Sequence, residues 1–115
     1  MANGQMVCGA NQENAAFSSG TCAERSACFY AASQFPVVAM KKIAIAAWTR
    51  LHRPADAEFE DCFQDIPISP CGSCRQALLE YETLHGSMEV ILYGKDVVYV
   101  FPSVASLLPF CFTEF

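Results

Sequence analysis

Three features are scarce or absent in this sequence, and each absence excludes a class of protein. No apolar run approaches the length of a membrane span, and the first residues lack the basic start and apolar stretch of a signal peptide. Lys and Arg form no cluster beyond Lys41-Lys42, and the net charge is −5, whereas a grip on a nucleic-acid backbone needs a basic stripe. We therefore expect a cytoplasmic protein that binds a small molecule, and neither a membrane nor a nucleic acid.

Internal repeats and low-complexity segments are also absent, and 53% of the 115 residues are hydrophobic. A chain of this length and composition can bury a hydrophobic core, so we expect a single domain over residues 1–115. Seven cysteines are a high count, but the number is odd and no secretory leader is visible. We therefore expect the cysteines to be reduced.

Strand and helix signals alternate along the chain. Strands are expected at residues 5–9, 42–48, 66–69, 89–93 and 97–101, and helices at residues 22–33, 72–83 and 103–108. Thr21 fits the N-cap of the first helix, with Glu24 three residues on, which is a capping-box pattern. Pro70 comes just before the second helix. This alternation predicts an α/β sandwich around a mixed sheet.

Three cysteines in two short motifs indicate a zinc site. The motifs are Cys22-Ala23-Glu24 and Pro70-Cys71-Gly72-Ser73-Cys74. Cys71 and Cys74 are three residues apart, so they share a helix face and can bind one ion. Cys22 and Cys71 fall at predicted helix starts, where free N–H groups and the helix dipole favour the thiolate that zinc requires. Three protein ligands leave one position of a tetrahedral zinc ion open for water, which is typical of catalytic sites.

Glu24 is the predicted catalytic residue beside this zinc site. Its carboxylate can take a proton from zinc-bound water, deliver it to a ring nitrogen and later to the departing amine. The hydroxide adds to an amidine-like ring carbon, ammonia leaves, and the product carries a carbonyl group. Three thiolates give the site an excess negative charge, which we expect Arg25 to offset through hydrogen bonds to the ligand sulfurs.

Each of these features also has a purely structural interpretation. A single Cys-x-x-Cys motif is often a structural zinc knuckle or a redox pair, and Glu24 taken alone is explained most simply by the capping box. Catalysis is favoured by the combination of both motifs with an open fourth position. The other candidates are expected to be structural or surface residues: Cys8, Cys28, Cys62 and Cys111 as small buried apolar residues, and His52 and His85 in loop or helix-end positions.

The combined motifs resemble those of the cytidine deaminases that act on free nucleosides. A Cys or His, a nearby Glu and a Pro-Cys-x-x-Cys motif form the signature of the zinc-dependent nucleobase deaminases. The similarity also includes residues 9–15, 21–27, 69–76 and 107–112, so it covers nearly the whole chain. It implies zinc-dependent hydrolysis of cytidine or 2′-deoxycytidine to the uridine counterpart and ammonia, a reaction of pyrimidine salvage.

The same resemblance implies a fold and a set of substrate contacts. The fold would be a three-layer α/β/α sandwich with a five-stranded mixed sheet. Asn11 and Glu13 would hydrogen-bond the ribose hydroxyls, and backbone groups near Ala23 and Ser69 would hold the pyrimidine edge. Phe112 would stack on the base in a neighbouring subunit's site, because the three-cysteine ligand set resembles the homotetrameric branch of the family.

The sequence departs from the family pattern mainly at its start. The family begins with a helix and with a strand that lies inside the sheet, and this chain shows neither, so we expect it to be N-terminally truncated relative to the family. Phe17 stands where the family often has Tyr, and the connection over residues 49–64 is atypical.

Two other functions stay open at this point. A deaminase of another amino-heterocycle, such as a blasticidin-type nucleoside, guanine or a nucleotide, would share the zinc motifs, although Asn11 and Glu13 favour a nucleoside with free ribose hydroxyls. A catalytically impaired, zinc-stabilised subunit would agree with the truncation. Glu24 favours an enzyme, because a purely structural zinc site does not need that carboxylate.

Overall fold

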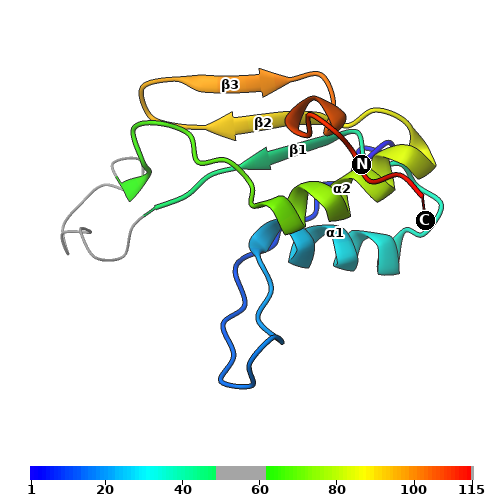
Figure 1. Cartoon of the computed structure of the whole chain (residues 1–115), viewed down its shortest axis with the longest axis horizontal. Coiled ribbons are helices and arrows are strands. Elements are labelled where there is room, and N and C mark those ends of the chain that lie inside the picture. The colour runs from blue at the N-terminus through cyan, green and yellow to red at the C-terminus, as the bar shows by residue number, and fades with distance from the viewer. Residues whose placement is uncertain (49–61, 115) are drawn as a thin grey trace.

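The computed structural model describes residues 1–48 and 62–114, which fold into helices packed on a small sheet (Figure 1). The elements are α1 (Ala23–Gln34), β1 (Lys42–Ile45), α2 (Gly72–His85), β2 (Glu89–Tyr93), β3 (Val98–Phe101) and the short 3-10 helix η3 (Ala105–Leu107). Within these two described segments, no helix is both long and apolar enough to cross a bilayer.

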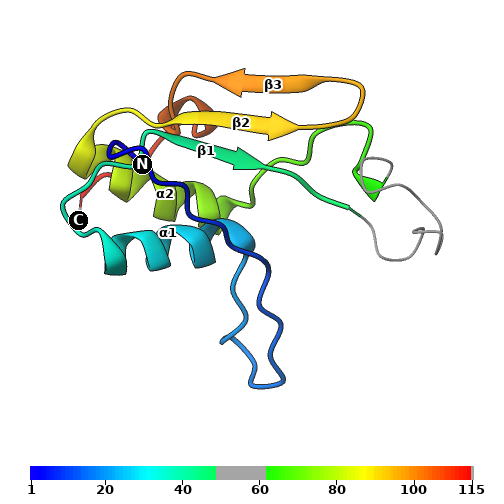
Figure 2. The ribbon, with the colours of Figure 1, turned by 180° about the vertical axis from the view of Figure 1, so that it is seen from behind.

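The three strands form a mixed sheet in the order β1-β2-β3. β1 runs parallel to β2, with Ile43 beside Val90, and β2 runs antiparallel to β3, with Val90 opposite Phe101. Both helices lie on the same side of the sheet (Figures 1 and 2). The predicted α/β fold with a mixed sheet is therefore confirmed. The described residues contain three strands with helices on one face, whereas five strands between two helical layers were expected.

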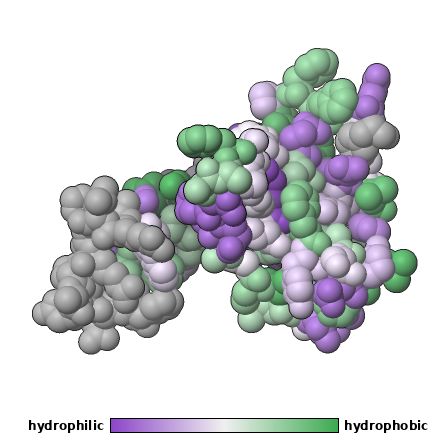
Figure 3. All heavy atoms as spheres, turned by 90° about the horizontal axis from the view of Figure 1, so that it is seen from below, coloured by the Kyte–Doolittle hydropathy of each residue, from purple (hydrophilic) through white to green (hydrophobic). Residues whose placement is uncertain are grey.

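The core lies between the helices and the sheet. In β2, buried Val90 and Leu92 alternate with partly exposed Ile91, as a strand with one covered face requires. The buried apolar residues are Cys28, Ala31, Met40, Leu78, Leu79, Met88, Val90, Leu92, Val104 and Leu107. Burying a large apolar side chain stabilises a fold by about 1.5–3 kcal/mol, so this cluster holds both helices on the sheet. On the molecular surface, hydrophobic and hydrophilic residues are interspersed on the face seen in Figure 3.

Two of the predicted strands are wrong. Residues 5–9 run beside α1 and do not join the sheet (Figure 2). Gly9 allows this segment to approach the helix closely, because a Cβ atom at this position would lie only 2.7 Å from the backbone nitrogen of Ala27. Residues 66–69 form no strand, because Pro67 and Pro70 lack the N–H group that a strand ladder uses.

Other elements differ from their predicted bounds at the ends. β1 stops at Ile45, and Trp48 forms an isolated bridge with Phe63 instead of extending the strand. α2 continues to His85 and ends at Gly86, whose φ of 97° lies in the region that favours glycine. The strand predicted at residues 89–93 matches β2, and the helix predicted at residues 103–108 is only the single turn of η3.

Glu82 is a buried carboxylate that ties three parts of the fold together. It lies on α2, and its Oε2 atom accepts hydrogen bonds from the N–H groups of Met88 at 2.9 Å and Val104 at 2.7 Å. Its Oε1 atom accepts a third from the N–H of Ala105 at 3.0 Å. Since a buried carboxylate is tolerated only when it is hydrogen-bonded, these contacts fix the entry to β2 and the start of η3 against α2.

Replacing Glu82 by Ala should lower the free energy of unfolding by about 3 kcal/mol or more, because three backbone N–H groups would lose their acceptor. Urea unfolding followed by circular dichroism would show this as a lower midpoint. Glu80→Ala is the matched control, since Glu80 is exposed on the same helix and its replacement should change stability by no more than about 0.5 kcal/mol. Equal midpoints for the two variants would contradict the anchoring role of Glu82.

Candidate metal centre

The starts of α1 and α2 lie side by side, and this brings three thiols together (Figures 1 and 2). Cys22 is the N-cap of α1 and Cys71 is the N-cap of α2, both with extended backbone, while Cys74 is buried in the first turn of α2. Their three Sγ atoms all lie within 4.8 Å of one another. The structure therefore gathers the three predicted ligands into one cluster.

The geometry of this cluster fits a zinc ion. The Sγ atoms of Cys22 and Cys71 are 3.9 Å apart. Two thiolates bound to one tetrahedral zinc at about 2.3 Å lie about 3.8 Å apart, so the pair needs almost no adjustment to bind the metal. Soft thiolate sulfur is also a preferred ligand for zinc. The three cysteines are thus suited to bind one zinc ion and leave one coordination position for another ligand.

Local hydrogen bonds and burial affect the three thiols differently. The backbone N–H of Cys74 donates to Cys71 Sγ at 3.4 Å, and this lowers the pKa of the Cys71 thiol. Burial raises the pKa of Cys74 to about 12, although the hydrogen bond from Arg25 opposes that change. A bound metal ion removes the proton from a coordinating thiol, so the cluster reaches its full negative charge only with the ion in place.

Arg25 contacts the thiol cluster, as its predicted role of offsetting the negative charge of the thiolates requires. Its Nη2 atom donates to Cys22 Sγ at 3.5 Å, and hydrogen bonds to Cys22 and Cys74 raise the pKa of Arg25 further above its usual value. In the described part of the chain, the Nε atom of Arg25 is buried without a hydrogen-bond partner. The guanidinium group is therefore a fixed positive charge at the thiol cluster, as a site with three thiolates requires.

The capping box predicted for α1 does not form. The helix begins with Cys22 rather than Thr21 at the N-cap, and the Thr21 hydroxyl donates to the Ser19 carbonyl at 3.4 Å. Glu24 lies in the first turn of α1 and is not one of the residues whose ligand atoms form the thiol cluster. The structural explanation of Glu24 thus loses its main support, and the carboxylate remains close to the thiols in the chain without being a ligand.

Asn11 takes over the capping of α1 from outside the helix. Its Oδ1 atom accepts a hydrogen bond of 2.8 Å from the Ala23 N–H, one of the amide groups that a helix start leaves without an internal partner. A backbone bridge between Gln12 and Thr21 joins the segment that carries Asn11 to the residues that lead into α1. Asn11 therefore positions the start of α1, and with it Cys22, a role that no motif in the sequence predicts.

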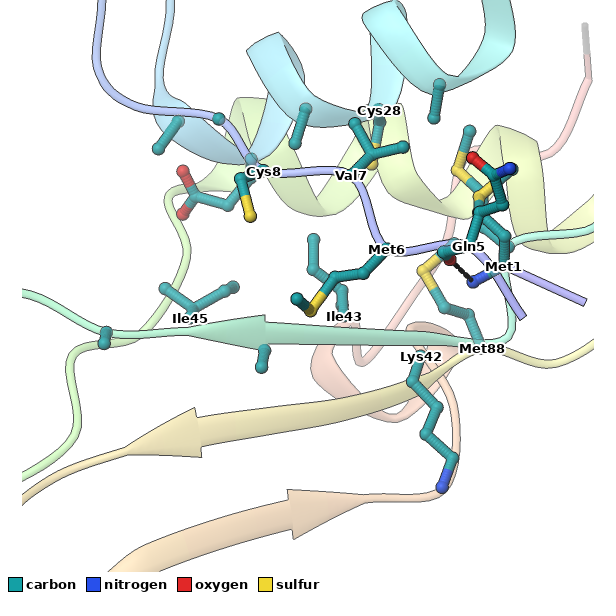
Figure 4. Close-up of a pocket in the computed structure, with 18 residues that line it drawn as sticks. Met1, Gln5, Met6, Val7, Cys8, Cys28, Lys42, Ile43, Ile45 and Met88 are labelled. Carbon is teal, nitrogen blue, oxygen red and sulfur yellow. Dashed lines mark hydrogen bonds between the residues drawn. The ribbon is translucent and has the colours of Figure 1, made fainter. Parts of the chain in front are cut away.

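Two cavities border the start of α1. The smaller, about 160 Å³, is lined by Asn11, Gln12, Glu13, Gly20, Thr21, Cys22 and Arg25. The larger, about 420 Å³, lies between α1, β1 and the N-terminal segment, and Figure 4 shows Met6, Val7 and Ile43 on its walls. Glu24 and Ala23 also line the larger cavity, but none of the three thiols does. The smaller cavity is the one at the metal centre, although it is below the usual size of a ligand pocket.

Ser69 and Phe112 are the two remaining predicted substrate contacts, and the structure places them in different surroundings. Ser69 is exposed on the turn that leads into Cys71, and Arg75 donates to its Oγ atom. Phe112 is 60% exposed and lines neither cavity, but its carbonyl accepts a hydrogen bond of 2.8 Å from Gln76 Nε2. The structure thus places Ser69 next to the metal ligands and leaves the Phe112 ring at the surface of this chain.

The other cysteines and histidines lie outside the cluster. Cys28 is buried, as predicted, and burial raises its pKa to about 11. The prediction is wrong for Cys8, which is exposed, and only partly correct for Cys62 and Cys111, which are half-buried. No disulfide joins cysteines in the part of the chain that the structure describes. His85 ends α2, and His52 lies outside the described residues.

Known cytidine deaminases are similar to nearly the whole chain. The family profile described as the cytidine and deoxycytidylate deaminase zinc-binding region matches residues 1–88. A cytidine deaminase of Sporosarcina psychrophila is 36% identical over 112 residues, which are 97% of this chain and 69% of that protein. A cytidine deaminase of Halalkalibacterium halodurans is 32% identical over 115 residues, which are 98% of this chain and 72% of that protein.

A solved structure shows the same fold. The crystal structure of a cytidine deaminase from Burkholderia pseudomallei superposes with a TM-score of 0.69 and 31% sequence identity. The match covers 96% of this chain and 75% of that chain.

Replacing Cys71 by Ser should abolish tight zinc binding, because a hydroxyl is a much weaker zinc ligand than a thiolate. Cys71 is exposed, so the change leaves no cavity in the core. Metal analysis after gel filtration should find about one zinc per wild-type chain and almost none in Cys71→Ser. Cys111→Ser is the control and should retain its zinc, since Cys111 lies outside the cluster. Zinc retention by both variants would exclude the three-thiol site.

Proposed function

The chain belongs to the family of the cytidine and deoxycytidylate deaminases and is a zinc-dependent hydrolase of C–N bonds. On this premise we propose that it converts cytidine and 2′-deoxycytidine to the uridine counterparts and ammonia, as a step of pyrimidine salvage. The observation that carries this proposal is the cluster of three thiols at two helix starts, with a 3.9 Å separation that fits zinc and with Arg25 bonded to one of them. This ligand set has the three protein ligands of a catalytic zinc site.

The residues of the centre have separate tasks. Cys22, Cys71 and Cys74 would hold the zinc ion. When bound, zinc supplies a Lewis acid that brings the pKa of a coordinated water molecule close to neutral pH. Arg25 keeps a positive charge beside Cys22 and so limits the excess negative charge of three thiolates, which would otherwise oppose ionisation of the water.

Glu24 would move the protons of the reaction. Its carboxylate oxygen accepts one proton from the attacking water and donates it to the ring nitrogen next to the amino-bearing carbon. It then takes the second proton and passes it to the amino group, which leaves as ammonia while the carbonyl forms. Water and cytidine thereby become uridine and ammonia without another reactant. The position of Glu24 in the first turn of α1, two residues after the ligand Cys22, supports this role.

Asn11 and Glu13 would select a nucleoside over a free base. Both line the small cavity that Cys22 and Arg25 also border. Because Asn11 Oδ1 already accepts from Ala23, the Asn11 NH₂ group is the part that would donate to a ribose hydroxyl. Ser69, exposed on the ligand turn, would meet the pyrimidine edge. The Ala23 N–H is engaged by Asn11, so other backbone groups near Ala23 would hold the pyrimidine edge together with those near Ser69.

Glu24→Gln should retain zinc and fold but lose turnover by on the order of 10²–10⁴-fold, because the amide cannot accept a proton. Uridine formation from cytidine by the zinc-loaded chain would be followed by absorbance. Glu80→Gln, the same change at an exposed site on α2, should keep the parent rate. A Glu24→Gln variant as active as the Glu80→Gln control would overturn the assigned proton transfer.

The same assay separates the alternative functions. If Asn11 and Glu13 contact the ribose, cytidine should react faster than the free base cytosine at equal concentration. A higher rate with a blasticidin-type nucleoside than with cytidine would identify a deaminase of another amino-heterocycle. Zinc uptake without turnover of any of these compounds would favour a non-catalytic, zinc-stabilised subunit.

We also propose that the chain assembles as a homotetramer in which Phe112 stacks on the base bound by a neighbouring subunit. Large aromatic side chains are exposed on the described chain, including Phe17 at 96%, Phe110 at 97% and Phe112 at 60%. Aromatic residues are enriched at protein–protein interfaces, so these exposed rings support an assembly. Native mass spectrometry of the zinc-loaded chain should give four times the monomer mass, and a monomer at assay concentration would exclude the assembly.

A further inference from the structure

Arg75 is the residue directly after the zinc ligand Cys74, and it donates hydrogen bonds in three directions. Its Nε atom donates to the Pro70 carbonyl at 2.9 Å, and its Nη2 atom donates to the hydroxyl of Ser69. Its Nη1 atom donates to the Leu107 carbonyl at 2.7 Å. Arg75 thus contacts the two residues that precede the ligand Cys71 and also reaches a segment more than thirty residues away in the sequence.

The turn before Cys71 depends on these donors. Residues 66–69 do not form the strand that their sequence predicts, so no sheet partner fixes this stretch. Pro70 is fully buried and has no N–H group of its own, and its carbonyl is held by Arg75. The backbone N–H of Arg75 also donates to the Cys71 carbonyl at 3.0 Å. The Arg75 side chain therefore holds the carbonyl of the residue just before the ligand Cys71, while its backbone makes the ordinary helix bond to Cys71 itself.

A guanidinium group is specifically suited to this task. It presents donors at the corners of a rigid plane, so one side chain can reach three acceptors that lie in different directions. Lysine has the same charge, but its donors radiate from one nitrogen atom and cannot reproduce this arrangement. The three contacts thus explain why the position needs arginine rather than any cation.

The same side chain links the metal centre to the C-terminal segment. The Leu107 carbonyl ends η3, and Leu107 and Leu108 bond back to Val104 and Ala105. The next residue of α2, Gln76, holds the Phe112 carbonyl. Two neighbouring residues after a zinc ligand therefore place the segment that carries Phe112.

We propose that Arg75 is a positioning residue for the zinc centre: it sets the direction of Cys71 and makes the order of the C-terminal segment depend on zinc. This inference rests on the zinc centre of the proposed function. The zinc ion would hold Cys71 and Cys74 from one side, while Arg75 and Gln76 hold the C-terminal segment from the other side of the same helix turn. Loss of the ion would loosen this turn and release residues 105–112.

Arg75→Lys tests the first part of the proposal. It should weaken zinc binding by about 10-fold or more, the usual effect of losing a residue that orients metal ligands, while far-UV circular dichroism stays unchanged. Zinc affinity would be measured by chelator competition. Cobalt would replace zinc in a second sample, because the cobalt absorption bands report ligand geometry and should shift in Arg75→Lys. Glu82→Gln is the control for a merely destabilised fold: it should lower the urea midpoint but leave the cobalt spectrum unchanged.

Hydrogen–deuterium exchange on the wild-type chain tests the second part and does not depend on the folding of a variant. Removing zinc should increase the exchange of amides in residues 105–112, whereas the amides of β2, on the opposite side of the core, should exchange as before. In Arg75→Lys, the exchange of residues 105–112 should be high with or without zinc.

The outcomes distinguish this inference from the function on which it rests. A wild-type chain that takes up no zinc would refute the proposed zinc centre itself. Zinc uptake by the wild type, together with an Arg75→Lys variant of equal affinity and identical cobalt spectrum, would overturn the role of Arg75 alone. Unchanged exchange of residues 105–112 after zinc removal from the wild type would overturn the link to the C-terminal segment.

Discussion

The packing of two helix starts against each other is the constraint on which the rest of this structure depends. A zinc site with three thiols needs sulfur atoms about 3.8 Å apart, and the chain meets this by placing Cys22 and Cys71 at the N-caps of adjacent helices. Neither helix start is fixed by the helix alone. Asn11 holds the first amide of α1, and Arg75 holds the turn before α2. The core behind them keeps both helices on the sheet, so the spacing of the three thiols depends on the packing of the whole domain.

The parts of the fold that the sequence predicts well are those with a local cause. The apolar run before Gly94-Lys95-Asp96 predicts β2 to the residue, and the two zinc motifs predict the starts of α1 and α2 within one residue. The strands expected at residues 5–9 and 66–69 fail for different reasons. Pro67 removes a donor, which is visible in the sequence, but the contact of Gly9 with α1 depends on tertiary packing that no local pattern shows.

The residues of the candidate site also fall into a group that the sequence predicts and a group that it does not. The three zinc ligands and Arg25 follow from motif spacing, because the requirement for nearby thiolates and a compensating charge is encoded over a few residues. The contacts made by Glu82 and Arg75 could not be predicted, since their partners lie up to 32 residues away in the sequence. On α2, Glu82 resembles the exposed Glu80 in type, and only burial distinguishes the anchoring carboxylate from the solvated one. Charged residues that serve as tertiary anchors have no signature of their own.

The two ends of the Asn11 amide set a limit on how this enzyme can diversify. The oxygen accepts from the first amide of α1, and in the proposed function the nitrogen would donate to a ribose hydroxyl in the cavity that Asn11 lines. Aspartate would preserve the helix contact but lose the donor, and alanine would lose both. A lineage that adapts to a new sugar cannot freely change this position without also shifting a metal ligand. New substrate preferences would therefore arise more readily at neighbouring loop residues that have no second task.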